Sequence, residues 1–73
     1  MNIKQIGSNR TVLTLNNGVE ILFSYETPVA SRFEGEYQQT EQHYSVTTSK
    51  HINQWGAKGA TKQPQAYFDR LVA

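Results

Sequence analysis

The N-terminal part of the chain alternates apolar and polar residues in the way that two β-strands joined by a turn do. Residues 10–15 (RTVLTL) are rich in β-branched side chains, and residues 19–25 (VEILFSY) place every second side chain on the same face. The Asn-Gly pair between them favours a type I′ turn, in which both central residues have positive φ. We therefore predict a hairpin over residues 10–25, closed at Asn16–Gly18. The face expected to be buried holds Val19, Ile21, Phe23 and Tyr25.

The middle of the chain is more polar and contains stronger turn signals. Pro28 has no amide hydrogen and is therefore predicted to end the second strand of the hairpin. Residues 31–36 (SRFEGE) predict a turn. Residues 37–48 are rich in Gln, Thr and Tyr, and they predict one long polar strand or two shorter ones. Residues 37–47 of this segment are expected to pair antiparallel with residues 27–33.

The two ends of the chain add an edge strand and two helices. Residues 2–9 predict an edge strand that ends at a Gly-Ser-Asn turn. Ser49 stands in the place of an N-cap, before a short helix that ends at Gly56. The small and basic residues of 56–63 predict an exposed linker, and Pro64 suits the first turn of a C-terminal helix. The apolar face of that helix, expected to pack on the sheet, holds Tyr67, Phe68, Leu71 and Val72.

These elements predict a single small domain, residues 1–73, of the α+β class. Its antiparallel sheet has three to five strands, in a hairpin or meander, with one short helix and a C-terminal helix packed on the sheet. A chain of this length without cysteines has a small core and no disulfides, and such chains often gain stability by self-association. We therefore predict a homodimer, formed by edge pairing of residues 37–48 or by the apolar side of the C-terminal helix.

The charge balance and the cysteine count exclude several classes of protein. Seven basic and six acidic residues give a formal net charge of +1, which argues against a strongly basic DNA coat and against an acidic DNA mimic. No cysteine is present to hold zinc, the two histidines form no metal motif, and we expect no cofactor. No apolar run approaches the roughly 20 residues that span a bilayer, and the N-terminus lacks a signal-peptide core. We therefore expect a cytoplasmic protein without a membrane partner.

Most of the candidate chemistry gathers between residues 47 and 62. A helix start presents N–H groups and a positive dipole end to an anion, nearby hydroxyls and cations would add to this, and an indole could stack a base. We expect a nucleic acid or a nucleotide to bind at Thr47, Thr48, Ser49, Lys50, His51, Trp55, Lys58 and Lys62. The structural alternative is a helix cap at Ser49, with Ile52 and Trp55 in the core. Because the small core leaves little room for a preorganised cavity, we expect no enzyme.

Two segments carry a resemblance to known sequences. They are FSYETPVA (Phe23–Ala30) and SVTTSKHIN (Ser45–Asn53), and an Asn-Gly pair (Asn17 and Gly18) precedes the first. The chain resembles, over roughly residues 11–72, a family of short uncharacterised proteins of bacteriophages and bacteria that share FSYxTPVA and SxTTS(K/R)HIN segments. The resemblance implies a phage or mobile-element origin, and a host-cell cytoplasm as the place of action. It implies no activity, substrate or catalytic residue.

Three functions remain open at this point. The first is a non-enzymatic binding protein for nucleic acid or a phosphorylated small molecule, which uses the 47–55 segment and the basic C-terminal third. The second is an inhibitor that blocks a host or defence protein through a face or edge of its sheet. The third is a structural or assembly protein of a particle.

Overall fold

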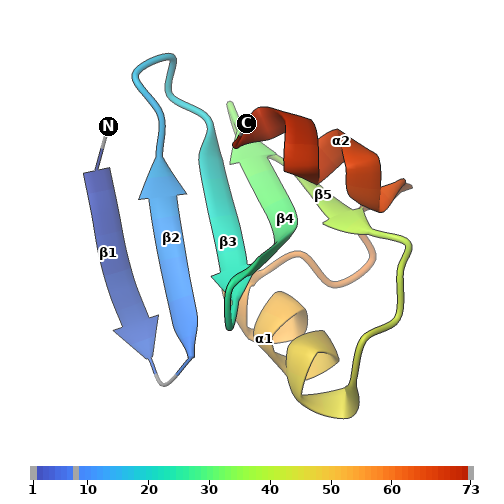
Figure 1. The fold of residues 1–73 in the computed structure, drawn as a ribbon. Helices are drawn as coiled ribbons and strands as arrows, with labels where there is room; N and C mark the ends of the chain where they lie inside the picture. The colour runs from blue at the N-terminus through green and yellow to red at the C-terminus, as the bar shows by residue number, and fades with distance from the viewer. Residues whose placement is uncertain (1, 8, 73) are drawn as a thin grey trace.

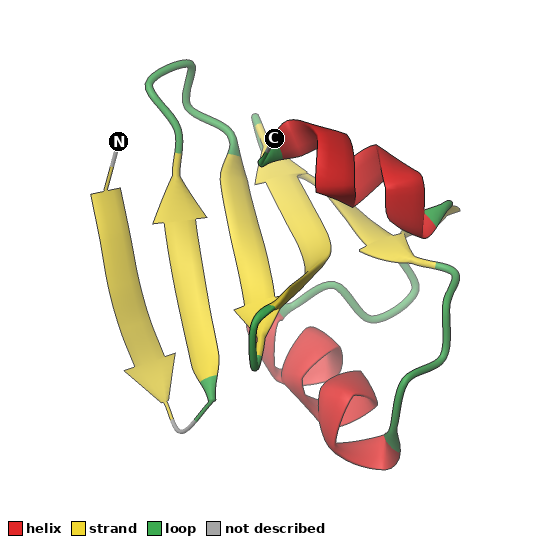
Figure 2. Ribbon diagram, in the orientation of Figure 1, coloured by secondary structure: helices red, strands yellow, loops and turns green. Residues whose placement is uncertain are grey.

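The computed structural model describes residues 2–7 and 9–72, which form one six-stranded sheet and two helices (Figures 1 and 2). The strands are β1 (Asn2–Gly7), β2 (Arg10–Thr14), β3 (Glu20–Ser24), β4 (Thr27–Phe33), β5 (Glu36–Thr40) and β6 (Thr61–Gln63). The helices are α1 (Val46–Trp55) and α2 (Gln65–Leu71). The strands lie in the sheet in chain order, antiparallel except for the parallel pair β5 and β6. The predicted α+β class is confirmed, but three to five antiparallel strands is an undercount.

The predicted hairpin is present as β2 and β3, with Leu13 opposite Ile21. Its turn differs from the predicted type I′. The amide of Gly18 donates to the carbonyl of Leu15 (3.0 Å), and Gly18 alone among the loop residues has a positive φ, of 91°. This is the geometry of a three-residue loop, in which a type I turn is followed by a glycine in the left-handed region. On the outer side of the hairpin β1 pairs with β2, as expected of an edge strand; its predicted turn includes Ser8, which lies outside the described residues.

The type I′ geometry occurs instead between β4 and β5. Glu34 and Gly35 have φ of 52° and 81°, and Phe33 pairs with Glu36 across a two-residue loop.

The second strand of the hairpin ends before Pro28, as predicted, but it ends at a turn over residues 25 and 26 rather than at the proline. Pro28 lies inside β4, the strand expected over residues 27–33, which pairs antiparallel with β5. The register shifts there, and a β-bulge is one of the few places in a sheet that tolerates a residue without an amide hydrogen.

Residues 44–48, predicted as the end of a long strand, lead instead into α1. The strand ends at Thr40, and Ser45 is the N-cap, with its Oγ accepting a hydrogen bond from the amide of Thr48 (3.1 Å). The alternation of apolar and polar residues that suggested a strand does not correspond to a buried face, because Val46 is 69% exposed. The buried positions of α1 follow the helical period instead: Thr48, His51 and Ile52. The predicted helix end at Gly56 is confirmed.

Part of the predicted linker is a strand. β6 joins the sheet beside β5, and the amide of Glu41 donates to the carbonyl of Gln63 (2.9 Å). The loop before β6 is held by Gln39, whose Nε2 donates to the carbonyls of Ala57 (3.3 Å) and Ala60 (3.2 Å). A side-chain amide of the neighbouring strand thus orders a segment whose composition suggests flexibility.

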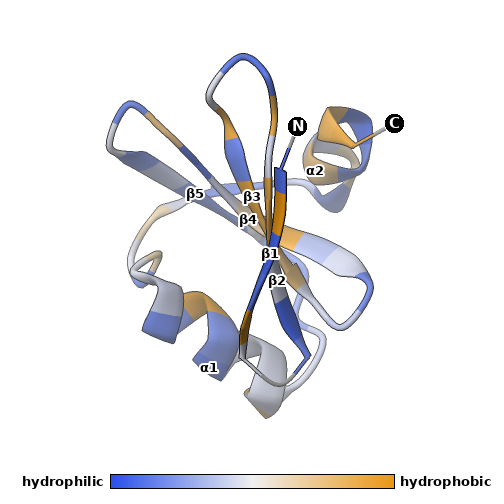
Figure 3. Ribbon diagram, turned by 90° about the vertical axis from the view of Figure 1, so that its left-hand side faces the viewer, coloured by the Kyte–Doolittle hydropathy of each residue, from blue (hydrophilic) through white to orange (hydrophobic). Residues whose placement is uncertain are grey.

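The two helices lie on opposite faces of the sheet (Figure 3). On the α1 face the core consists of Val12, Leu22, Val29, Ala30, Ile52 and Ala57. The other face holds Ile21 and Phe68, and α2 packs mainly on β4 there, as predicted for the C-terminal helix. Because neighbouring strand residues point to opposite faces, Ile21 and Leu22 are both fully buried.

The sheet corrects two further predictions. Phe23 is only half-buried, because α2 does not extend over the β1 end of the sheet. Tyr25 is 53% exposed and lies in the turn after β3, with a positive φ of 59° and its ring beside His51 of α1.

The sheet edge predicted for the homodimer is not free over residues 36–40, whereas the apolar side of α2 is only partly used within the domain, since Val72 is 36% exposed. Residues 36–40 form an inner strand between β4 and β6, and Phe68 of α2 is buried within the domain. The homodimer itself stays a prediction.

Candidate functional site

The predicted phosphate site depended on a helix that starts at Ser49, and the structure places that start four residues earlier. Ser45 is the cap, and the amide of Ser49 donates to the carbonyl of Ser45 (3.1 Å) inside the first turn. The prediction that Ser49 is the N-cap is therefore wrong. The typical cap contribution of about 1 kcal/mol belongs to Ser45.

Two of the predicted ligand-binding residues form a buried polar cluster with β3. The Oγ of Ser24 lies 2.8 Å from Nδ1 of His51 and 3.0 Å from Oγ1 of Thr48. Ser24 is 2% exposed and His51 is 7% exposed. A serine beside a histidine is also found at catalytic sites, but this hydroxyl has no surface that a substrate could reach. The Ser24–Thr48–His51 cluster therefore joins α1 to the sheet.

The sequence gives no sign of this cluster, because its partners lie 24 and 27 residues apart. The residues of the cluster do, however, belong to the two segments that carry the family resemblance. Ser24 belongs to the FSYETPVA segment, while Thr48 and His51 belong to the SVTTSKHIN segment. The two segments therefore meet in the fold, and their hydroxyl and imidazole groups satisfy one another in a buried place.

The burial of His51 has a consequence for stability against acid. Burial, and then the positive charge of Arg10, lower the pKa of His51 from its ordinary value of about 6.5. The ring of Tyr25 lies beside the imidazole, with its centroid 6.0 Å from that of His51. Between the two pKa values the unfolded chain binds more protons at His51 than the folded protein does. The free energy of unfolding is therefore expected to fall as pH drops from about 6.5 through the lowered folded pKa.

Urea unfolding at several pH values between 7.5 and 5.5 measures this loss. His51→Gln is expected to be less stable at pH 7.5 and to lose much of the pH dependence over that range. His43→Gln is the matched control, since His43 is exposed, and it should keep the dependence. An unchanged pH dependence in His51→Gln would contradict the assignment.

Trp55 lies at the other end of α1, in a second cluster. Its ring meets that of Tyr37 edge-on, with centroids 5.5 Å apart, and the guanidinium of Arg32 lies 5.6 Å from the Trp55 ring centroid. Arg32 donates from Nη1 to the hydroxyl of Tyr37 (2.9 Å) and forms an ion pair with Glu20. The hydrogen bonds that Arg32 donates to Tyr37 and then to Glu20 raise the pKa of Arg32. The indole thus already has aromatic and cationic neighbours within the domain.

The remaining predicted ligand-binding residues do not all lie at one site. Thr47 and Lys50 are exposed on α1, and Lys58 lines a shallow hollow beside Tyr37 and Gly59. Ser49 and Lys62, in contrast, line one cavity of about 200 Å³ between α1 and the strands β5 and β6. We call this cavity the polar pocket. Its other lining residues are Gln39, Thr40, Glu41, Gln42, His43, Ile52 and Asn53.

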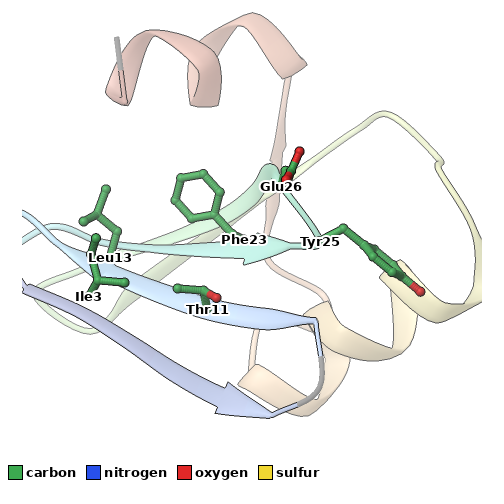
Figure 4. Close-up of a pocket in the computed structure, with 6 residues that line it drawn as sticks. All are labelled: Ile3, Thr11, Leu13, Phe23, Tyr25 and Glu26. Atoms are coloured by element: carbon green, nitrogen blue, oxygen red, sulfur yellow. The ribbon is translucent and has the colours of Figure 1, made fainter.

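A second cavity, which the sequence did not suggest, lies on the uncovered part of the α2 face. It has a volume of about 310 Å³ and is lined by Ile3, Thr11, Leu13, Phe23, Tyr25 and Glu26 (Figure 4). We call it the apolar groove. The sheet register builds it, because Ile3 lies opposite Leu13 and Thr11 opposite Phe23. The signal in the sequence was Ile3, one of the two isoleucines in an otherwise polar first strand, and its side chain is 69% exposed.

Within residues 2–7 and 9–72 no group of three or more His, Cys, Asp and Glu side chains could hold a metal ion. In the same part of the chain, neither helix is both long enough and apolar enough to cross a membrane.

Comparison with known proteins places the chain in a family without assigning it a function. The model of a "Family of unknown function (DUF8033)" matches residues 1–70, so the chain belongs to this family. No curated protein and no solved structure matches it.

Proposed function

We propose that this chain is a non-enzymatic binding protein that holds another protein at its apolar groove. One observation carries the proposal: three neighbouring strands present Ile3, Leu13 and Phe23 together on the part of the α2 face that the helix leaves uncovered. Contiguous exposed apolar surface of this kind is typical of a binding site. If the chain has the phage origin that its resemblance implies, the partner would be a host or defence protein and the chain its inhibitor.

The composition of the groove favours a protein over a nucleic acid. Its lining has one acidic side chain, Glu26, and no basic one. Binding to a phosphate backbone depends on Lys and Arg side chains that replace counterions. An apolar lining next to an exposed tyrosine, Tyr25, resembles the core of a protein interface instead.

Capture from a lysate of the cell that carries or hosts the gene tests the proposal. Ile3→Ser is the variant of choice, because Ile3 is so exposed that its loss costs little stability. We expect it to weaken binding of the captured, purified protein by roughly tenfold, the effect of about 1.4 kcal/mol of lost apolar contact. Val46→Ser is the matched control, since Val46 is also 69% exposed but lies on α1. Equal binding by wild type and Ile3→Ser would contradict the proposal.

A second candidate function is the binding of a phosphorylated ligand, and one observation favours it. Ser49 and Lys62 share the polar pocket with His43 and Asn53, so a hydroxyl, an ammonium, an imidazole and an amide line one small cavity. The same capture, repeated with nuclease and with Lys62→Gln, separates the two candidates. A captured species that nuclease removes, or that Lys62→Gln loses while Ile3→Ser keeps it, would favour the phosphorylated ligand.

A further inference from the structure

We propose that the protein partner binds as a seventh strand along the free edge of β1, with an extended segment that alternates apolar and acidic residues. This inference rests on the proposed function and adds to it the form and chemistry of the partner. The apolar side chains of the partner segment would extend the apolar groove. An acidic side chain on the opposite face of that segment would lie beside Lys4.

The free edge belongs to a strand long enough to accept another. Among the described strands β1 pairs with β2 alone, so within residues 2–7 and 9–72 no strand lies along its outer row of backbone N–H and C=O groups. Its residues from Asn2 to Ile6 are all exposed. At the opposite edge β6 has only three residues, and the chain enters α2 two residues later. Addition of an extended segment to an exposed edge is a common mode of peptide recognition.

The two faces of β1 specify different side chains in an added strand. Ile3 lies opposite Leu13 and therefore points to the face of the apolar groove. Lys4 lies opposite Val12, whose side chain belongs to the core on the α1 face. Because side chains of neighbouring strands lie side by side, an added strand would place apolar residues next to Ile3 and alternate residues next to Lys4.

The positive charge of Lys4 favours acidic side chains at those positions of the added strand that lie on the same face as Lys4. Among residues 2–7 and 9–72 the one ion pair joins Arg32 and Glu20, so Lys4 has no carboxylate partner. An acidic residue opposite or diagonal to Lys4 would supply it, and cross-strand pairs of opposite charge are favourable. A lysine on an edge strand also discourages pairing with neutral or basic strands, so it adds specificity.

The same lysine argues against a second copy of this chain as the occupant. An antiparallel pairing of two β1 strands that uses all of Asn2 to Ile6 is centred on Lys4. It would place the two Lys4 ammonium groups directly opposite each other, and like charges in that position are destabilising. A segment of a different protein avoids this repulsion.

Selection from a displayed library of random ten-residue peptides tests the inference on the intact chain. Wild type, Lys4→Glu and Lys58→Glu are immobilised in parallel, with thermal melts as a check that each is folded. Wild type and Lys58→Glu, the control at an exposed lysine far from β1, are expected to enrich peptides that alternate apolar and acidic residues. Lys4→Glu is expected to enrich apolar and basic ones. For a synthesised peptide of the kind that wild type enriches, Lys4→Glu should weaken binding roughly three- to tenfold, because it removes an exposed ion pair and adds a like-charge repulsion.

Hydrogen exchange of backbone amides, with that peptide bound, distinguishes the possible failures. Slower exchange at the outer amides of β1 is the expected result. Protection confined to other segments, the same charge preference on wild type and Lys4→Glu, or no enrichment at all would overturn strand addition. A dimer in sedimentation that Gln5→Pro abolishes would put a second copy at the edge and would also overturn it. The proposed function fails separately, if Ile3→Ser binds the captured protein as wild type does.

Discussion

Replacing Phe68 with alanine is expected to cost roughly 3–5 kcal/mol of the free energy of unfolding, the usual range for a buried phenylalanine. The side chain is fully buried, and it is the buried residue of α2. A helix of seven residues does not form by itself, so its stability comes from this contact with the sheet. Small domains have total stabilities of about 5–15 kcal/mol, so the variant could lose most of its folded population.

Urea unfolding of wild type, Phe68→Ala and Phe23→Ala measures this effect with a matched control. Phe23 lies on the same face of the sheet but is half-buried in the apolar groove, so its replacement removes less contact. The midpoint should shift clearly less for Phe23→Ala than for Phe68→Ala. Equal shifts would mean that α2 does not anchor through Phe68, or that the groove is filled in the folded protein.

Replacing Leu22 with alanine is expected to cost roughly 2–5 kcal/mol, through the loss of buried methyl groups and the cavity that remains. Leu22 is fully buried in the core under α1, together with Val12, Ala30 and Ile52. It is held on the opposite face from Phe68, so the two substitutions test the two layers separately. Leu13→Ala is the control, because Leu13 lies one strand away on the groove face and is half-buried. A smaller loss for Leu22→Ala than for Leu13→Ala would contradict the position of α1.

The parts of the fold that the sequence predicts are those with local signals. The β2–β3 hairpin follows from β-branched runs around an Asn-Gly pair, and the end of α1 follows from Gly56. Even there, the type I′ turn predicted between β2 and β3 is found between β4 and β5 instead. Gly18 closes a three-residue loop, while Glu34 and Gly35 adopt the type I′ geometry. A glycine marks where the chain turns, and the register of the paired strands decides how it turns.

The start of α1 could not be predicted, because the segment fits two periods. Tyr44, Val46 and Thr48 alternate as in a strand, whereas Thr48, Ile52 and Trp55 recur as in a helix. The choice depends on Ser24, which lies 24 residues before Thr48 and supplies the polar partner that a buried helix face needs. The Ser24–Thr48–His51 cluster is thus both the reason for the helix and the reason that two predicted ligand residues face inwards.

The candidate site could be predicted only in part, for a related reason. Ser49 and Lys62 do share the polar pocket, but the residues between them in the chain go to different surfaces. The apolar groove depends on the pairing of three strands and on where a helix stops. A one-dimensional pattern contains neither. It shows which side chains alternate, but not which faces another element leaves uncovered.

The order of the strands has a consequence for how the chain assembles during synthesis. From β1 to β5 each strand pairs with the one made just before it, so every contact in that series is local and its loop closes at little entropic cost. The parallel pairing of Gln38 with Thr61 is different, since it encloses the whole of α1. A nascent chain can therefore form an open five-stranded sheet, with β5 as a temporary edge, before β6 and α2 leave the ribosome. During that interval both the first and the last strand of the sheet are open to neighbouring chains, and the pairing of β6 with β5 closes one of these two edges.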